Sequence, residues 1–132
     1  MQNFVGPIRY MAPESLIRGE YSSASDSFMY ANFLYELLFR RVPFDETPNL
    51  LDVAERIRCG ERPILTDDTD PIFLTIFKSC WSVDPADRLS LSQIVVLFQH
   101  LDEPDMSDPN LLTPTLPTLT KEVDHYEIFN SF

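Results

Sequence analysis

The feature that most limits how this chain can fold is the segment 26–39, in which apolar residues leave almost no face polar. Nine of its side chains are apolar before the closing Phe39: Phe28, Met29, Tyr30, Ala31, Phe33, Leu34, Tyr35, Leu37 and Leu38. The preceding run from Ser22 to Asp26 is rich in residues that cap helices, so we predict a helix from Asp26 to Phe39. Because this helix is too short to span a bilayer, it is expected to be buried on all sides of a protein core.

Start and stop signals predict a short helical turn, ended by Gly19, and three further helices. Thr47-Pro48 supplies an N-cap and a first helical residue for an amphipathic helix that stops at Gly60. Asp70-Pro71 repeats this start signal for the next helix, and the capping box Ser90-Leu91-Ser92-Gln93 opens the last one. Since no segment indicates a sheet, the predicted fold class is mainly α.

The last 32 residues differ in composition from the rest. Seven of the acidic residues and only one base lie from Leu101 onward, so this part carries −6 of the formal net charge of −11. It also holds four of the eleven prolines. We therefore predict a folded part, 1–100, and an acidic, Pro- and Thr-containing flexible tail, 101–132. An acidic surface repels phosphate groups, so neither nucleic acid nor an anionic membrane is an expected partner.

The residue types that commonly bind metals are sparse. Cys59 and Cys80 are the only cysteines, and their spacing is not that of a zinc site, so no metal is expected. His100 and His125 are isolated from any candidate nucleophile. The absence of a basic and apolar leader at Met1 favours a cytoplasmic protein with reduced thiols.

Four motifs occur in order along the chain. They are Gly6–Leu16 with its Ala-Pro-Glu, Tyr21–Phe28 with its Ser-Asp, Glu36–Phe44 with its Pro-Phe, and Cys80–Arg88 with its Cys-Trp and Asp-Pro. Their order and distances resemble the C-terminal lobe of eukaryotic protein kinases, in particular the tyrosine kinase and tyrosine-kinase-like groups. The resemblance covers about residues 5–98. It implies part of a kinase C-lobe, from the end of the activation segment to the last helix.

The resemblance also implies roles for particular residues. Glu14 would form a structural ion pair with Arg88, tying the activation segment to the loop before the last helix. Asp26 would anchor the family's catalytic loop, but in this chain we expect it to act only as a helix N-cap. Five consecutive residues would form the ledge against which a substrate residue rests, with a rigid loop of no substrate role as the alternative: Pro7, Ile8, Arg9, Tyr10 and Met11.

Phosphoryl transfer requires a Gly-rich lid, a Lys–Glu pair, a base Asp, and an Asn and a second Asp on magnesium. In the family all of these precede the Ala-Pro-Glu motif, and the thirteen residues before Glu14 contain neither Asp nor Lys. ATP and magnesium therefore belong to the complete family domain, and we expect no catalytic, cofactor-binding or metal-binding residues in this chain.

Two hypotheses about the function remain open. The chain is the substrate-side half of a kinase that phosphorylates protein Ser/Thr or Tyr, or it is a non-catalytic binding or scaffold module. Under either hypothesis, the expected partners are protein substrates or signalling proteins.

Overall fold

A computed structural model describes residues 7–101 of the chain, so the predicted flexible tail lies outside the described residues apart from Leu101. Contacts within the chain define one compact unit that runs to Phe98 and a second that begins at Gln99. The first unit is described below by itself. The predicted boundary at residue 100 stays a prediction.

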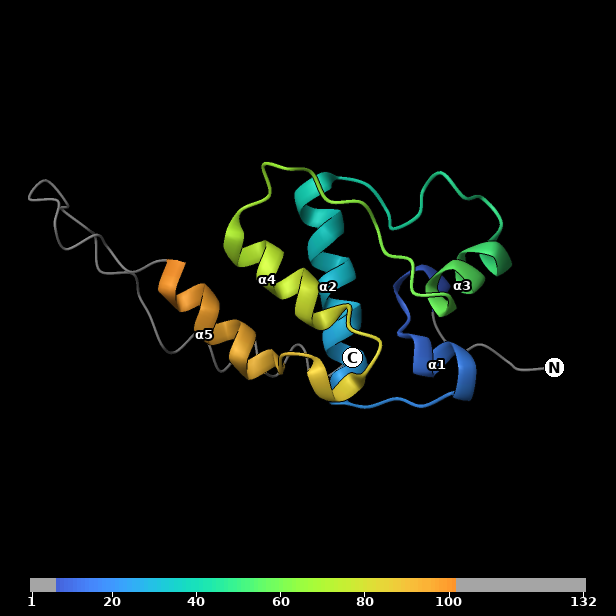
Figure 1. Cartoon of the computed structure of the whole chain (residues 1–132), viewed down its shortest axis with the longest axis horizontal. Helices are drawn as coiled ribbons and strands as arrows, with labels where there is room; N and C mark the ends of the chain where they lie inside the picture. Colours follow the sequence, from blue (N-terminus) through green and yellow to red (C-terminus); the bar gives the residue numbers. More distant parts are fainter. Residues whose placement is uncertain (1–6, 102–132) are drawn as a thin grey trace, which may run out of the picture. The chain divides into compact units, whose positions relative to one another are not determined.

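The described residues contain helices and no strand, which confirms the predicted mainly α class and is consistent with part of a kinase C-lobe. In chain order the elements are η1 (Ile8–Tyr10), α1 (Pro13–Arg18), α2 (Ser23–Phe39), α3 (Leu50–Arg58), α4 (Pro71–Cys80), η2 (Pro85–Asp87) and α5 (Leu91–Leu101). Helix α4 packs along α2, while α3 packs against η1 and α1 on the other side (Figure 1).

Helix α2 begins three residues before the predicted position. Its N-cap is Ser22, whose hydroxyl accepts the backbone N–H of Ser25, while the Ser25 hydroxyl accepts the backbone N–H of Ser22. This reciprocal pair satisfies two amide groups that a helix start leaves without partners. The prediction that Asp26 caps the helix is therefore wrong, because Asp26 is already the fourth helical residue.

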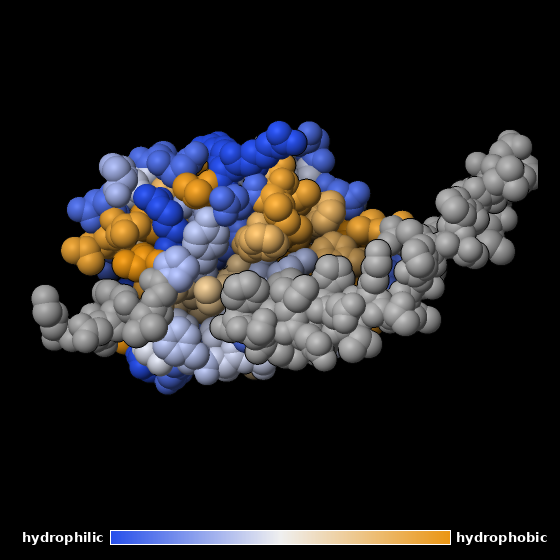
Figure 2. All heavy atoms as spheres, turned by 180° about the vertical axis from the view of Figure 1, so that it is seen from behind, coloured by the Kyte–Doolittle hydropathy of each residue, from blue (hydrophilic) through white to orange (hydrophobic). Residues whose placement is uncertain are grey.

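The prediction that α2 is buried on all sides is also wrong for this chain. Phe28 and Ala31 are buried, but Phe33 is 48%, Leu37 59% and Leu38 42% exposed. The physical reason is the small number of close neighbours, because the described elements that contact α2 most are η1, η2 and α4. Apolar side chains reach the surface in several places on the face that Figure 2 shows.

The start of α3 also differs from the prediction. Asn49, not Thr47, caps this helix, and its side chain accepts the backbone N–H groups of Leu51 and Asp52. The predicted stop at Gly60 is confirmed. Gly60 has φ +91°, and its N–H and that of Glu61 bond back to the last turn, as in a Schellman motif.

The start signals of the last two helices are confirmed. The Asp70 carboxylate accepts the backbone N–H of Ile72 at 2.9 Å, and Pro71 is the first residue of α4. At α5 the Gln93 side chain accepts the Ser90 N–H at 2.9 Å, and the Ser90 hydroxyl accepts the Gln93 N–H at 3.2 Å. Both caps are local, which is why the sequence alone indicates them.

Candidate functional site

The Glu14 and Arg88 side chains form a bidentate ion pair across 74 residues of chain. Arg88 Nη1 lies 2.6 Å from Glu14 Oε1, and Nη2 lies 2.8 Å from Oε2. The Arg88 side chain is 0% and that of Glu14 5% exposed. The same guanidinium donates to the carbonyls of Ala24 and Ser82. One arginine therefore joins α1, the start of α2 and the turn before η2.

Burial alone would raise the pKa of the Glu14 carboxyl. The hydrogen bonds from Arg88, with help from a backbone N–H and the charge of Arg88, outweigh burial and hold this pKa below its usual value. The carboxylate form is thus the one that the fold stabilises. Two exposed and unpaired charges, the alternative that spacing alone favours, do not describe this geometry.

Sequence reasoning missed a second, partly buried guanidinium, that of Arg62. Its Nε donates to the Trp81 carbonyl at 2.9 Å and its Nη1 to the Ile57 carbonyl at 3.0 Å, while the buried Nη2 has no partner within residues 7–101. Burial and the nearby charge of Arg88 lower the pKa of Arg62 to about 10. An arginine directly after a helix stop is a signal for such contacts, because it can return to the last carbonyls.

The five ledge residues do not all lie at the surface. Pro7 is exposed, and Ile8, Arg9 and Tyr10 in η1 are partly buried. Met11, at 1% exposure, belongs to the core together with Ala12. A molecule resting on the ledge would therefore meet Pro7 and the residues of η1, and Met11 would support them from below.

Two residues of α2 hold the ledge. The Tyr10 hydroxyl donates to Glu36 Oε2 at 2.5 Å, and burial together with the Glu36 carboxylate raises the pKa of Tyr10 to about 12. The Asn32 amide donates to the Tyr10 carbonyl at 3.1 Å and accepts Trp81 Nε1 at 3.1 Å. Asn32 is 2% exposed. This single polar residue thus connects the ledge to the end of α4.

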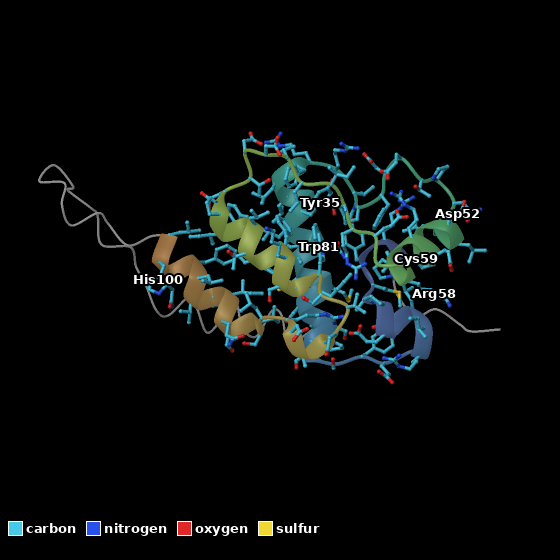
Figure 3. All side chains as sticks on the ribbon, viewed as in Figure 1. Tyr35, Asp52, Arg58, Cys59, Trp81 and His100 are labelled. Carbon is cyan, nitrogen blue, oxygen red and sulfur yellow. The ribbon has the colours of Figure 1, made fainter. Side chains whose placement is uncertain are left out.

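Sequence reasoning gave no role to Asn32, a polar residue within the apolar segment 26–39. The position of Asn32 could have indicated its role, because a side-chain amide inside an apolar helix needs hydrogen-bond partners. Figure 3 shows Tyr35 and Trp81 close to α2, and Cys59 at the end of α3. The rings of Tyr35 and Trp81 lie 6.1 Å apart, so the Asn32 bond sits next to an aromatic contact between α2 and α4.

Arg9 connects the ledge to residues 40–49, which we call the α2–α3 segment. Its guanidinium donates to the carbonyls of Pro43 at 3.2 Å, Phe44 at 2.5 Å and Thr47 at 2.8 Å. No carboxylate within residues 7–101 forms an ion pair with it. Within this part of the chain, the acceptors of Arg9 are therefore backbone carbonyls.

Asp26 lies exposed in the first turn of α2. Its carboxylate accepts no hydrogen bond from the described residues, and partial desolvation raises its pKa. The catalytic loop that Asp26 would anchor in a kinase is not part of this sequence. Among the described residues no cluster of three or more potential metal ligands occurs. No helix in this part of the chain is both long and apolar enough to cross a bilayer.

Known proteins share sequence similarity with this chain. The family model described as "Protein tyrosine and serine/threonine kinase" matches residues 1–98. The RGS domain-containing serine/threonine-protein kinase A of Dictyostelium discoideum is 32% identical over 82% of this chain. Human mitogen-activated protein kinase kinase kinase 7 is 33% identical over 76% of it, and STY17 of Arabidopsis thaliana 31% over 73%.

The chain therefore belongs to the eukaryotic protein kinase family. Its relatives are consistent with the tyrosine-kinase-like group within that family. The match spans only a small share of each relative, namely 10% of the Dictyostelium kinase and 17% of both the human and the Arabidopsis protein.

Proposed function

We propose that this chain is the substrate-side helical half of a protein kinase domain. Joined to the residues that bind ATP and magnesium, it would support phosphoryl transfer to Ser/Thr or Tyr of a protein substrate in the cytoplasm. The observation that carries the proposal is the buried Glu14–Arg88 pair, which spans 74 residues and holds α1 against the start of α2. Such a pair needs both partners, since one alone would be an uncompensated buried charge.

The same proposal assigns no catalysis to the isolated chain. Transfer of a phosphoryl group depends on positioning and on electrostatic stabilisation by a lysine, two magnesium ligands and a base. The only lysines here are Lys78, near the end of α4, and Lys121. We therefore expect no saturable binding of ATP with magnesium by the 132-residue chain in titration calorimetry. Micromolar affinity would contradict this expectation.

A chimera tests the positive half of the proposal. Residues 1–98 replace the matching segment in the kinase domain of human mitogen-activated protein kinase kinase kinase 7, whose other residues are kept. We expect the chimera to phosphorylate a peptide library. As the control, the chimera with Arg58→Gln, at an exposed position, retains this activity. A folded chimera that binds ATP but transfers no phosphate would overturn the proposal.

One observation favours the second function, a non-catalytic binding module. The exposed face of α2 with Phe33, Leu37 and Leu38 is an apolar surface that promotes association. On either proposal we expect the isolated chain to self-associate and to unfold at a temperature that depends on its concentration. Sedimentation and thermal unfolding at several concentrations measure this. Binding of a protein partner by the isolated chain, with an inactive chimera, would favour the binding module.

A further inference from the structure

Phe44 has an unusual backbone for a bulky residue. Its φ is +57°, in the left-handed region, and its side chain is 4% exposed. A side chain at this φ clashes with the backbone, so residues other than Gly, Asn and Asp rarely adopt it. Such a conformation persists only where its surroundings hold it, and it is found preferentially at functional sites. The question is therefore what holds Phe44.

Two arginines from different elements hold Phe44. Arg9 of η1 donates from Nη1 to the Phe44 carbonyl at 2.5 Å, and Arg56 of α3 lies over the Phe44 ring with its Cζ 4.7 Å from the centroid. The two arginines also meet at Thr47, where Arg9 Nη2 bonds the carbonyl at 2.8 Å and Arg56 Nη1 bonds the hydroxyl at 2.7 Å. The strained residue is thus held at its backbone and at its ring.

The two arginines differ in their charge partners. Arg56 also pairs with Glu46 and Glu61. Arg9 has only carbonyl acceptors within residues 7–101, and these come from Pro43, Phe44 and Thr47. The planar guanidinium, with donors in a fixed fork, can reach several carbonyls at once, whereas a lysine ammonium is a single point of charge. Arg9 is therefore placed to fix a backbone shape.

We propose that Arg9 is a positioning residue that couples the shape of the substrate ledge to the left-handed conformation of Phe44. This inference rests on the proposed kinase function. With the three carbonyl bonds in place, η1 and the α2–α3 segment form one rigid surface for the protein substrate. Without them, Phe44 relaxes toward a right-handed conformation and η1 loses its support on that side. Arg9 itself does not touch the reacting atoms.

Amide hydrogen exchange on the full 132-residue chain tests the coupling directly. The reporters are the N–H groups of Tyr10, Met11 and Thr47, which bond the carbonyls of Pro7, Ile8 and Phe44. In Arg9→Gln we expect about tenfold faster exchange of all three reporters together. The N–H of Trp81, bonded to Phe77, should not change and serves as the internal reference.

Arg9→Lys is the control for general unfolding, since it keeps the charge and most of the side chain. We expect exchange rates between those of the unmodified chain and Arg9→Gln, because one ammonium cannot bond all three carbonyls. Arg58→Gln, which removes an exposed arginine, should leave all reporters unchanged. Faster exchange in η1 alone, in the α2–α3 segment alone, or in neither would overturn the coupling.

The kinase chimera provides a readout that a purely structural role would not move. Arg9→Gln should raise KM for the peptide about tenfold while KM for ATP stays the same, and Arg9→Lys should recover part of the loss. An equal rise of both KM values, or a loss of kcat alone, would contradict a positioning role. If the unmodified chimera is inactive, the proposed function fails, and hydrogen exchange alone decides whether Arg9 couples the two segments.

Discussion

Arg88 and Arg62 offer a comparison between a buried arginine and a partly buried one beside the same core ring. Their Cζ atoms lie 5.1 and 5.0 Å from the centroid of the same Phe28 ring. Arg88 faces the Glu14 carboxylate from 74 residues away, while Arg62 bonds carbonyls and has one buried nitrogen without a partner in the described part of the chain. The two side chains share an environment and differ in their acceptors.

The two arginines therefore stabilise the fold in different ways, Arg88 by joining distant segments and Arg62 mainly by bonding nearby carbonyls. The Glu14–Arg88 pair is satisfied only when α1 and the turn before η2 come together, so it selects one arrangement of distant segments. Two of the Arg62 acceptors, the carbonyls of Ile57 and Glu61, lie within five residues of it. Arg62 closes the end of α3 and reaches α4 only through the Trp81 carbonyl. The predictions below test this contrast.

The largest effect is expected for Glu14→Ala, which leaves the Arg88 charge buried and uncompensated. Removing one partner of a buried pair costs about 3–5 kcal/mol of the free energy of unfolding. Urea denaturation of the full chain measures this loss. The matched control is Glu20→Ala, which removes an exposed carboxylate paired with Arg18 and should cost less than about 1 kcal/mol. Equal effects of the two substitutions would contradict a structural role for the pair.

The same pair predicts how stability depends on pH. The pKa of Glu14 is lower in the folded chain than its ordinary value of 4.5, because the Arg88 bonds outweigh burial. The stabilisation is therefore fully present above about pH 4.5 and is lost as pH falls through the folded-state pKa. Unfolding free energies between pH 7 and pH 3 should fall less steeply for Glu14→Ala than for the unmodified chain. Parallel curves would show that Glu14 does not titrate with folding.

The contrast also explains how much of the molecule could be predicted from the sequence. Caps such as Asp70 and the Ser90–Gln93 box are local, so spacing alone indicates them. The pairing of Glu14 with Arg88 was predicted from the family resemblance, because spacing carries no information about contacts over 74 residues. The distant acceptors of Arg9 and Arg62, such as the Phe44 and Trp81 carbonyls, could not be predicted, since every residue offers a backbone carbonyl.

Two errors at α2 and α3 have a similar origin. Ser22 and Asp26 are both good caps, as are Thr47 and Asn49, and sequence alone does not decide between candidates a few residues apart. The extent of the exposed face of α2 could not be predicted either. A helix that is apolar on every face is expected to be buried, but its sequence does not show how much of it the same chain can bury.

A smaller effect is expected for Arg62→Met. The substitution removes three carbonyl bonds but also removes a partly desolvated charge that has no carboxylate partner among residues 7–101. Replacing a buried charge by an apolar side chain of similar volume leaves nothing uncompensated, so the net loss should be about 1 kcal/mol. The control is Arg58→Met at an exposed position of α3. A loss as large as that of Glu14→Ala would show that Arg62 also acts as a long-range tie.

Asp26→Asn extends the comparison to carboxylates and has the smallest expected effect. Partial desolvation raises the pKa of Asp26, which is the reverse of Glu14, so the fold disfavours its charged form at neutral pH. Asparagine removes that charge and should raise the free energy of unfolding at pH 7 by at most about 0.5 kcal/mol, because solvent screens an exposed carboxylate. The gain should shrink as pH falls through the raised pKa of Asp26 in the folded chain and vanish well below the ordinary value of 3.8, where the carboxyl is protonated in both states. Asp52→Asn, in the first turn of α3, is the control for an ordinary carboxylate near a helix start. A lower stability for Asp26→Asn would show that the favourable interaction with the start of α2 outweighs desolvation. The expected gain would instead mark Asp26 as a residue that the isolated chain carries at a cost to its own stability.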